Sequence, residues 1–190
     1  MSFAQIKNRS VGKTLGIDCS TKSLAYAIFD GKDPLRAGEI FFQGGTVFER
    51  LKDAHEKVPA LMKAGILEFD HICFEGAILV GNNSKTGISL AYVYGAVMGG
   101  LMDSGVKVRT VAPLTWQAYI GNPNLKTPEK NAIKAANPEK SASWYQNAGR
   151  EFRKQRTLAF SRQFFEVPTG SDNVGDAIGI AWYAVNNPEF

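Results

Sequence analysis

Three short apolar runs, each bounded by polar or turn-forming residues, occupy the first quarter of the chain. They lie at Thr14–Ser20, Leu24–Asp30 and Ala37–Gln43, with short turns containing glycine or proline beside them. Runs of this length between turn signals are typical of β-strands. Because the connections are so short, the pattern predicts an antiparallel meander.

Helical periods alternate with further strand-like runs after the meander. Apolar side chains between residues 46 and 64 recur with helical spacing, and Pro59 should kink or split that helix. The next expected elements are a buried strand at Phe69–Phe74, a long helix at 85–104 closed by Gly105, a strand at Val106–Ala112 and a short helix at Leu114–Ile120. This alternation indicates an α/β fold whose later strands run parallel.

The last third of the chain is more polar. Residues 122–140 form a proline-punctuated, lysine-containing stretch, and residues 141–165 return to a helical pattern that is strongly basic. A final helix begins after Ser171, a favourable N-cap. We see no repeat and no linker, so we expect one domain over residues 1–190, within which 122–165 is a basic, partly expanded segment.

Composition narrows the class of protein. A hydrophobic content of 44% over 190 residues fits a domain with its own core. Residues 1–13 lack the apolar region of a secretory signal, and the apolar stretch 86–102 is too short and too rich in glycine to span a membrane. We therefore expect a soluble cytoplasmic protein without a membrane partner. We interpret Cys19 and Cys73 as small buried hydrophobes on opposite sheet faces, not as zinc ligands.

Positive charge is concentrated in one segment. The net charge is +4, yet residues 126–162 contain nine basic and three acidic residues and so carry +6, which leaves −2 for the rest. Such a segment fits a phosphate-binding surface, and a solvated helix face is the alternative. The candidates for contact with nucleic acid are Lys126, Lys130, Lys134, Arg150, Arg153, Lys154 and Arg156.

Acidic side chains occur where apolar strands end and where the last helix begins. Asp18 lies in the first strand-forming run, Glu75 ends another, and Asp172 and Asp176 are four residues apart in the last helix. Carboxylates that meet at one sheet edge repel one another unless cations lie among them, and hard oxygen ligands select Mg²⁺ or Mn²⁺. Two such ions, about 4 Å apart, would support phosphodiester hydrolysis. A capped helix with a solvated acidic face is the alternative for Asp172 and Asp176.

The order of these acidic motifs resembles that of the RuvC-like Holliday junction resolvases of the RNase H-like superfamily, particularly the diverged forms found in bacteriophages. Three motifs carry the resemblance and together cover most of the chain, from residue 14 to residue 184. They are Gly16-Ile17-Asp18-Cys19-Ser20, then Glu75-Gly76-Ala77-Ile78 with Asn82-Asn83 and the small-residue helix Leu90–Gly99, and finally Asn173 through Asp176 to Ala181.

The resemblance implies an RNase H-like mixed five-stranded sheet flanked by helices, and an endonuclease that resolves four-way DNA junctions by paired hydrolysis. It implies two Mg²⁺ ions, for which Mn²⁺ could substitute. It also implies a homodimer, since two-fold symmetry presents one site to each of two opposed strands. Ala91, Gly95 and Gly99, in register on the long helix, are candidates for the dimer contact. The implied catalytic residues are Asp18, Glu75, Asp172 and Asp176, and the implied metal ligands are these four and Asn173.

The sequence departs from the family pattern at three places. Asn173 stands where the family usually has an acid, so either its carbonyl binds the metal or Asp172 takes over. Ile78 stands where relatives often carry a phenylalanine that wedges into the junction. The stretch 122–144 is expanded, and Lys126 and Lys130 are the candidates for the family's lysine beside the active site.

Three other functions fit parts of the same sequence. The enzyme could act on flaps, replication forks or RNA–DNA hybrids, or the chain could be a junction-binding module in which Asn173 marks lost activity. Asp18 followed by Ser20 also resembles the phosphate-binding hairpin of actin-like ATPases and sugar kinases. Those proteins need a second glycine-rich phosphate loop, and nothing after Val106 supplies one.

Overall fold

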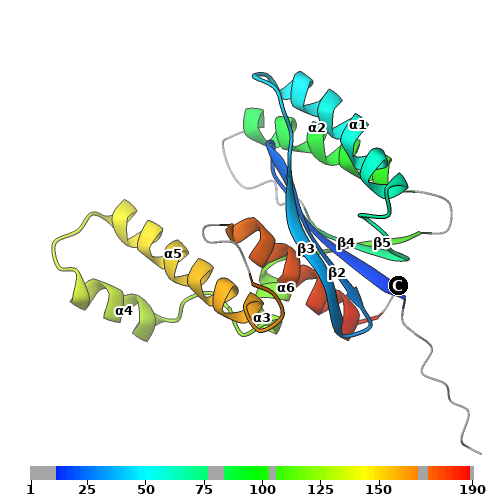
Figure 1. Ribbon diagram of the computed structural model, residues 1–190. Helices are drawn as coiled ribbons and strands as arrows, with labels where there is room; N and C mark the ends of the chain where they lie inside the picture. Colours follow the sequence, from blue (N-terminus) through cyan, green and yellow to red (C-terminus); the bar gives the residue numbers. More distant parts are fainter. Residues whose placement is uncertain (1–11, 77–83, 103–105, 167–170, 189–190) are drawn as a thin grey trace, which may run out of the picture.

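A mixed five-stranded β-sheet with helices on both faces forms the body of the protein (Figure 1). The computed structural model describes residues 12–76, 84–102, 106–166 and 171–188. Within them the strand order is β3-β2-β1-β4-β5, so β1 lies at the centre of the sheet. The central position of β1 is what allows its carboxylate, Asp18, to have neighbours on both sides.

The strands follow the order predicted from the apolar runs. β1 pairs antiparallel with β2 and β2 with β3, whereas β4 runs parallel to both β1 and β5, as predicted. β3 begins earlier than expected and includes Pro34, which is tolerated because an edge strand does not need every backbone N–H. The strands are β1 (Lys13–Cys19), β2 (Ser23–Asp30), β3 (Asp33–Phe41), β4 (His71–Glu75) and β5 (Lys107–Val111).

Two helices cover one face of the sheet and a third covers the other (Figure 1). α1 and α2 pack together on the first face, and α6 lies on the second. Thr46 caps α1 in a capping box with Glu49, and α1 continues through Pro59 without being split. Gly105, the expected end of the long helix, lies outside the described residues. The helices are α1 (Val47–Lys63), α2 (Ser84–Leu101), α3 (Pro113–Tyr119), α4 (Thr127–Ala136), α5 (Ala142–Ser161) and α6 (Asp172–Asn186).

Alternation along β1 brings α6 directly onto the sheet. Leu15 and Ile17 point into the core beneath α1 and α2, whereas Gly16 faces α6. A Cβ on Gly16 would lie 2.4 Å from the backbone nitrogen of Ala181, so glycine is required for this close approach. The contact holds the N-terminal half of α6 over the end of β1, where Asp18 lies.

α4 and α5 form a helical hairpin that projects from the sheet (Figure 1). Sequence patterns predicted α5, although α5 ends at Ser161 instead of continuing to residue 165, and they missed α4. Pro128 lies in the first turn of α4, where a proline costs no hydrogen bond, and the Lys126 backbone N–H donates to Glu129 at 2.7 Å. The expanded segment is therefore ordered into a basic hairpin.

The two cysteines are free thiols on opposite faces of the sheet, as strand alternation predicted. Cys19 packs against the core beneath α1 and α2, and Cys73 is fully buried with Trp116 and Ile180. No helix within the described ranges is both long and apolar enough to cross a membrane.

Candidate active site

Three carboxylates lie in one row across the sheet, on the face that α6 covers. Asp18 of β1 pairs with Ala25 of β2, and Ala25 pairs with Glu39 of β3. The parallel pairing of β1 with β4, continued by one row, puts Glu75 beside Asp18. Paired residues point to the same face, so the row runs Glu39, Ala25, Asp18, Glu75. Ala25 is fully buried and packs against α6.

The first turns of α6 add acidic groups to this row. Ser171 caps the helix, its Oγ accepting a hydrogen bond from the Val174 N–H at 3.4 Å. Asp172 and Asp176 follow four residues apart, and Asp176 interacts electrostatically with Asp18, Glu75 and Asp172. The structure thus brings together the four carboxylates predicted to be catalytic, and their catalytic role remains a prediction.

Burial and mutual repulsion disfavour the charged forms of the carboxylates in this cluster. Burial, followed by the charges of Glu75, Glu39 and Asp172, raises the pKa of Asp18 to about 7. Burial, followed by the charges of Asp18, Glu75 and Asp172, raises the pKa of Asp176 well above its ordinary value. Carboxylates in this state bind protons, or cations in place of protons.

Two aromatic residues hold Glu75 in place. Trp116 of α3 donates from Nε1 to Glu75 Oε1 at 3.0 Å, and the Tyr94 hydroxyl donates to the Glu75 backbone carbonyl at 3.2 Å. Burial raises the pKa of Glu75, and the Trp116 hydrogen bond opposes that effect. A cavity of about 230 Å³ opens beside Asp18 and Glu75, so both carboxylates line space that a ligand could enter.

Glu39 also belongs to the site, although the sequence patterns did not point to it. Its Oε2 accepts a hydrogen bond from Ser171 Oγ at 2.8 Å, and its Oε1 accepts one from Asn173 Nδ2 at 2.9 Å. The signal that identifies Glu39 is its alignment with Asp18 across β2, which becomes visible only once the pairing register is known.

Lys154 of α5 reaches the same cluster. It forms an ion pair with Asp172, and this hydrogen bond is the main cause of the raised pKa of Lys154. Burial acts to raise the pKa of Asp172, but the contact with Lys154 outweighs burial and the pKa lies below its ordinary value. Of the two lysines expected beside the site, Lys126 precedes α4 and Lys130 lines a cleft between α4 and α5.

The donors of the cluster fit a divalent cation in their chemistry. Asp18, Glu75 and Asp176 offer hard carboxylate oxygens, and a cation among them would offset the repulsion that, after burial, raises the pKa values of Asp18 and Asp176. In the part of the chain that the structure describes, no three acidic, histidine or cysteine side chains form a group that could hold an ion as they stand. Binding would therefore require these side chains to turn, and Asp18 and Glu75 line a cavity that gives their own carboxylates room to move.

Some of the basic residues predicted to bind DNA have partners within the protein. Arg156 forms an ion pair with Glu129, and its guanidinium lies over the ring of Phe152 at 4.6 Å from the ring centre. Arg153 donates a hydrogen bond to the side chain of Gln117. With Lys154 bound to Asp172, these residues hold α5 against α4, α3 and α6.

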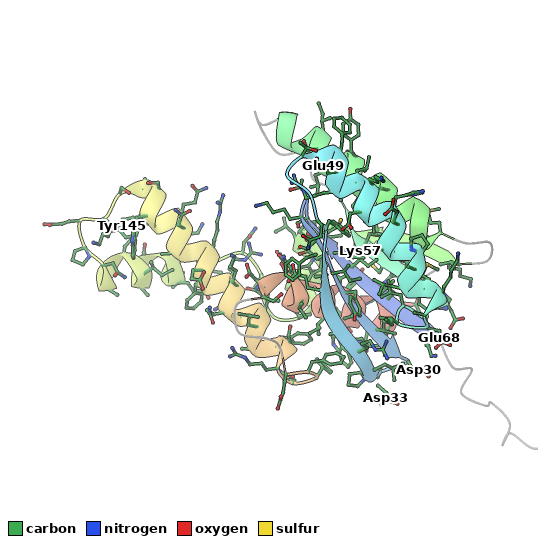
Figure 2. The ribbon with its side chains drawn as sticks, turned by 45° about the horizontal axis from the view of Figure 1, so that its top comes forward. Asp30, Asp33, Glu49, Lys57, Glu68 and Tyr145 are labelled. Carbon is green, nitrogen blue, oxygen red and sulfur yellow. The ribbon has the colours of Figure 1, made fainter. Side chains whose placement is uncertain are left out.

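The other basic residues line a cleft between α4 and α5. The cleft has a volume of about 490 Å³, and Lys130, Lys134 and Arg150 lie along it with Arg153. Lys134 lies 6.0 Å from the ring centre of Tyr145, which Figure 2 shows on the hairpin, away from the sheet. Within the described residues, Lys130, Lys134 and Arg150 form no ion pair with an acidic group. Their charges are therefore available to an anionic ligand.

The outer face of α2 exposes small and apolar residues. Ala91 and Tyr92 are exposed, and a Cβ added to Gly95 or Gly99 would meet nothing within 4 Å. Met102, just after the helix, is also exposed. Ile78 and the pair Asn82-Asn83, which belong to the second predicted motif, lie outside the described residues.

Comparison with known proteins shows a likeness in structure and none in sequence. No protein-family model and no curated protein sequence matches the chain. Thermus thermophilus RuvC is similar with a TM-score of 0.55 and 15% identity, covering 90% of this chain and 91% of RuvC. T. thermophilus RuvC in complex with Holliday junction substrate is similar with a TM-score of 0.54 and 16% identity, covering 92% of this chain and 93% of that one.

This protein has an RNase H-like fold. Its mixed five-stranded sheet in the order 3-2-1-4-5, with helices on both faces, matches the RuvC structures over nearly their whole length. The predicted fold class is confirmed. At 15–16% identity the likeness establishes the fold, and the activity has to be argued from the site.

Proposed function

We propose that this protein is a metal-dependent endonuclease that resolves four-way DNA junctions. The observation that carries the proposal is the convergence of Asp18, Glu75 and Asp176 on the RNase H-like scaffold, where the pKa of each carboxyl is raised. Several carboxylates stay ionised together near neutral pH when a cation lies among them. One of the RuvC structures that the fold resembles holds a Holliday junction substrate, which favours branched DNA as the partner.

The proposed ligands for Mg²⁺, or for Mn²⁺ in its place, are Asp18, Glu75 and Asp176, with an oxygen from Asp172 or Asn173. Two bound ions would activate a water molecule and stabilise the leaving oxygen of the cut phosphodiester. Asp172 Oδ2 is paired with Lys154, whereas Asn173 uses its Nδ2 for the bond to Glu39, so that bond leaves the amide oxygen of Asn173 for a ligand. We therefore favour Asn173 over Asp172 as the further ligand.

Residues around the cluster orient the proposed ligands and hold α6 against the sheet. Trp116 fixes one oxygen of Glu75, so the second oxygen can turn toward Asp18. The ion pair between Lys154 and Asp172 keeps the charge of Asp172 from adding fully to the repulsion at Asp176. Gly16 holds α6 close to β1, which keeps Asp176 within electrostatic reach of Asp18.

The basic cleft between α4 and α5 is the proposed contact for the DNA backbone outside the active site. Lys130, Lys134 and Arg150 lie along this cleft without an acidic partner in the described residues, and phosphates are the anions that DNA offers. Because the hairpin projects from the sheet, it can reach a second duplex arm of a branched substrate (Figure 1). Lys126 and the internally bonded Arg153, Lys154 and Arg156 would support this surface.

We expect the protein to act as a homodimer in the cytoplasm. Paired cutting of two opposed strands requires two sites related by a two-fold axis. The outer face of α2 is the candidate contact, because Gly95 and Gly99 leave space for the backbone of a second copy to approach and Tyr92 and Met102 are apolar groups that such a contact would cover.

Cleavage of defined substrates tests the proposal. A labelled synthetic four-way junction is incubated with the protein and Mg²⁺, beside a linear duplex, a flap and an RNA–DNA hybrid of the same sequence. Symmetric nicks in the junction alone support a resolvase. Cutting of flaps or hybrids as well would support a nuclease but contradict specificity for four-way junctions. Tight binding without cutting, in Mg²⁺ and in Mn²⁺, would favour a junction-binding module.

A further inference from the structure

Both carboxylate oxygens of Glu39 contact the start of α6. Oε2 accepts a hydrogen bond from Ser171 Oγ at 2.8 Å, and Oε1 accepts one from Asn173 Nδ2 at 2.9 Å. Burial favours the protonated form, but hydrogen bonds from Ser23, Asn173 and Ser171 outweigh burial and hold the pKa of Glu39 below its ordinary value. Both oxygens of Glu39 therefore act as acceptors at the start of α6.

The hydrogen bond to Glu39 fixes which way the Asn173 amide faces. Asn173 Nδ2 donates to Glu39 Oε1, so the NH₂ end of Asn173, and not its carbonyl, faces Glu39. The carbonyl Oδ1 then lies on the side away from Glu39. Asn173 and Asp176 are three residues apart in α6 and share one face of the helix, so this oxygen belongs to the face that carries Asp176.

We propose that Glu39 is a positioning residue that turns Asn173 Oδ1 toward the carboxylate cluster, where it serves as a neutral oxygen ligand for the bound cation. The inference rests on the proposed function, because it needs a cation among Asp18, Glu75 and Asp176. It deepens that function by assigning a role to a residue of β3 that lies two strands from Asp18, a separation of about 10 Å between backbones.

A neutral ligand suits a cluster in which neighbouring carboxylates already repel one another. A carboxylate at position 173 would lie against Glu39 and would add repulsion to Asp18 and Asp176, whose pKa values are already raised. The amide adds an oxygen without adding charge. The charge that holds the amide stays on Glu39, where three hydrogen bonds stabilise it.

A purely structural role for Glu39 is the competing explanation, because its contact with Ser171 also ties the N-cap of α6 to β3. Two substitutions separate the roles. Glu39→Gln introduces an amide that can donate a hydrogen bond. The Asn173 carbonyl can then accept from position 39 instead of facing the cluster. Ser171→Ala removes the other contact between Glu39 and α6, together with the cap, but leaves the hydrogen bond between Glu39 and Asn173.

The experiment measures Mg²⁺ binding to the full chain by isothermal titration calorimetry, and thermal unfolding without metal, for the wild type and both variants. Glu39→Gln is expected to weaken Mg²⁺ binding by about tenfold or more, as loss of a group that orients a metal ligand does. Ser171→Ala is expected to lower the melting temperature and to leave Mg²⁺ affinity unchanged.

Unchanged Mg²⁺ affinity in Glu39→Gln, with a lowered melting temperature like that of Ser171→Ala, would overturn the inference and leave Glu39 as an anchor of α6. If the wild type binds Mg²⁺ and cuts the junction while Glu39→Gln does both equally well, this inference alone fails. If the wild type neither binds Mg²⁺ nor cuts, the proposed function fails with it.

Discussion

Replacing Asp18 with asparagine should make the metal-free protein more stable, because it removes a charge that the fold holds at a cost. Asp18 has a pKa of about 7 in the folded protein and an ordinary value of 3.8. The folded state therefore binds the proton more tightly than the unfolded state does, and stability falls as pH rises from about 4 to about 7. Above that range the full penalty is present, and below it the penalty vanishes.

The size of the effect follows from the size of the shift. A difference of about 3 pKa units corresponds to about 4 kcal/mol at pH 8, and this is an upper limit because a folded protein relaxes around a charge. Each kcal/mol moves the melting temperature of a chain of this length by about 2–4 °C. Asp18→Asn should therefore melt several degrees higher than the wild type at pH 8 in EDTA, and at the same temperature near pH 4.

The assay is thermal unfolding across this pH range, in EDTA and in Mg²⁺. Asp30→Asn is the matched control, because Asp30 is exposed and far from the site (Figure 2). It lies opposite Lys13 in the β1–β2 ladder, at the other end of β1 from Asp18. Mg²⁺ should raise the melting temperature of the wild type and leave that of Asp18→Asn unchanged. An Asp18→Asn protein that is no more stable than the wild type at pH 8, or a control with the same gain, would refute the reasoning.

Three further predictions address the DNA surface, the orientation of a ligand and the dimer. Lys134→Ala combined with Arg150→Ala should weaken junction binding and lower the slope of log K against log salt by about 2, as measured by a salt titration of fluorescence anisotropy. Trp116→Phe removes the donor to Glu75 and should lower the cleavage rate by at least about tenfold while the far-ultraviolet circular dichroism stays unchanged. Gly95→Arg should convert a dimer to a folded monomer in sedimentation velocity, since its side chain meets open space in the single chain.

Each of these predictions has a result that would contradict it. An unchanged salt slope would remove the cleft between α4 and α5 from the DNA interface, and Arg156→Ala is the control, because Arg156 is already paired with Glu129. Full cleavage by Trp116→Phe would show that Glu75 needs no orienting partner. A Gly95→Arg protein that sediments like the wild type would move the dimer contact away from α2, and a wild-type monomer would remove the dimer itself.

Most of the sheet could be predicted because its residues follow local rules. Leu15, Gly16 and Ile17 form a short run without polar residues, which is typical of a strand buried on both faces. The turns on either side of the neighbouring strand indicate the meander. α4 was missed because Pro128 and Pro138 were interpreted as signs of irregular chain. A proline in the first turn of a helix is compatible with the helix, and the sequence does not distinguish that position from a loop until the helix is seen.

Two acidic residues of the site could be predicted from local sequence, whereas the residues that contact the cluster from other elements could not. Asp18 and Glu75 lie at the ends of apolar strands, which makes each of them conspicuous in the sequence. Glu39 lies in an edge strand where an acidic residue is ordinary, and only the register through Ala25 aligns it with Asp18. The contact of Lys154 with Asp172 depends on how α5 packs against α6, which no spacing within either helix encodes.

The most direct test of the account measures junction cleavage and junction binding on the same samples of wild type, Asp18→Asn and Asp30→Asn in Mg²⁺. The account predicts that Asp18→Asn loses cleavage and keeps binding, and that Asp30→Asn keeps both. Loss of binding together with cleavage in Asp18→Asn would mean that Asp18 supports the structure. Cleavage that persists in Asp18→Asn would contradict the claim that this carboxylate cluster is the catalytic centre.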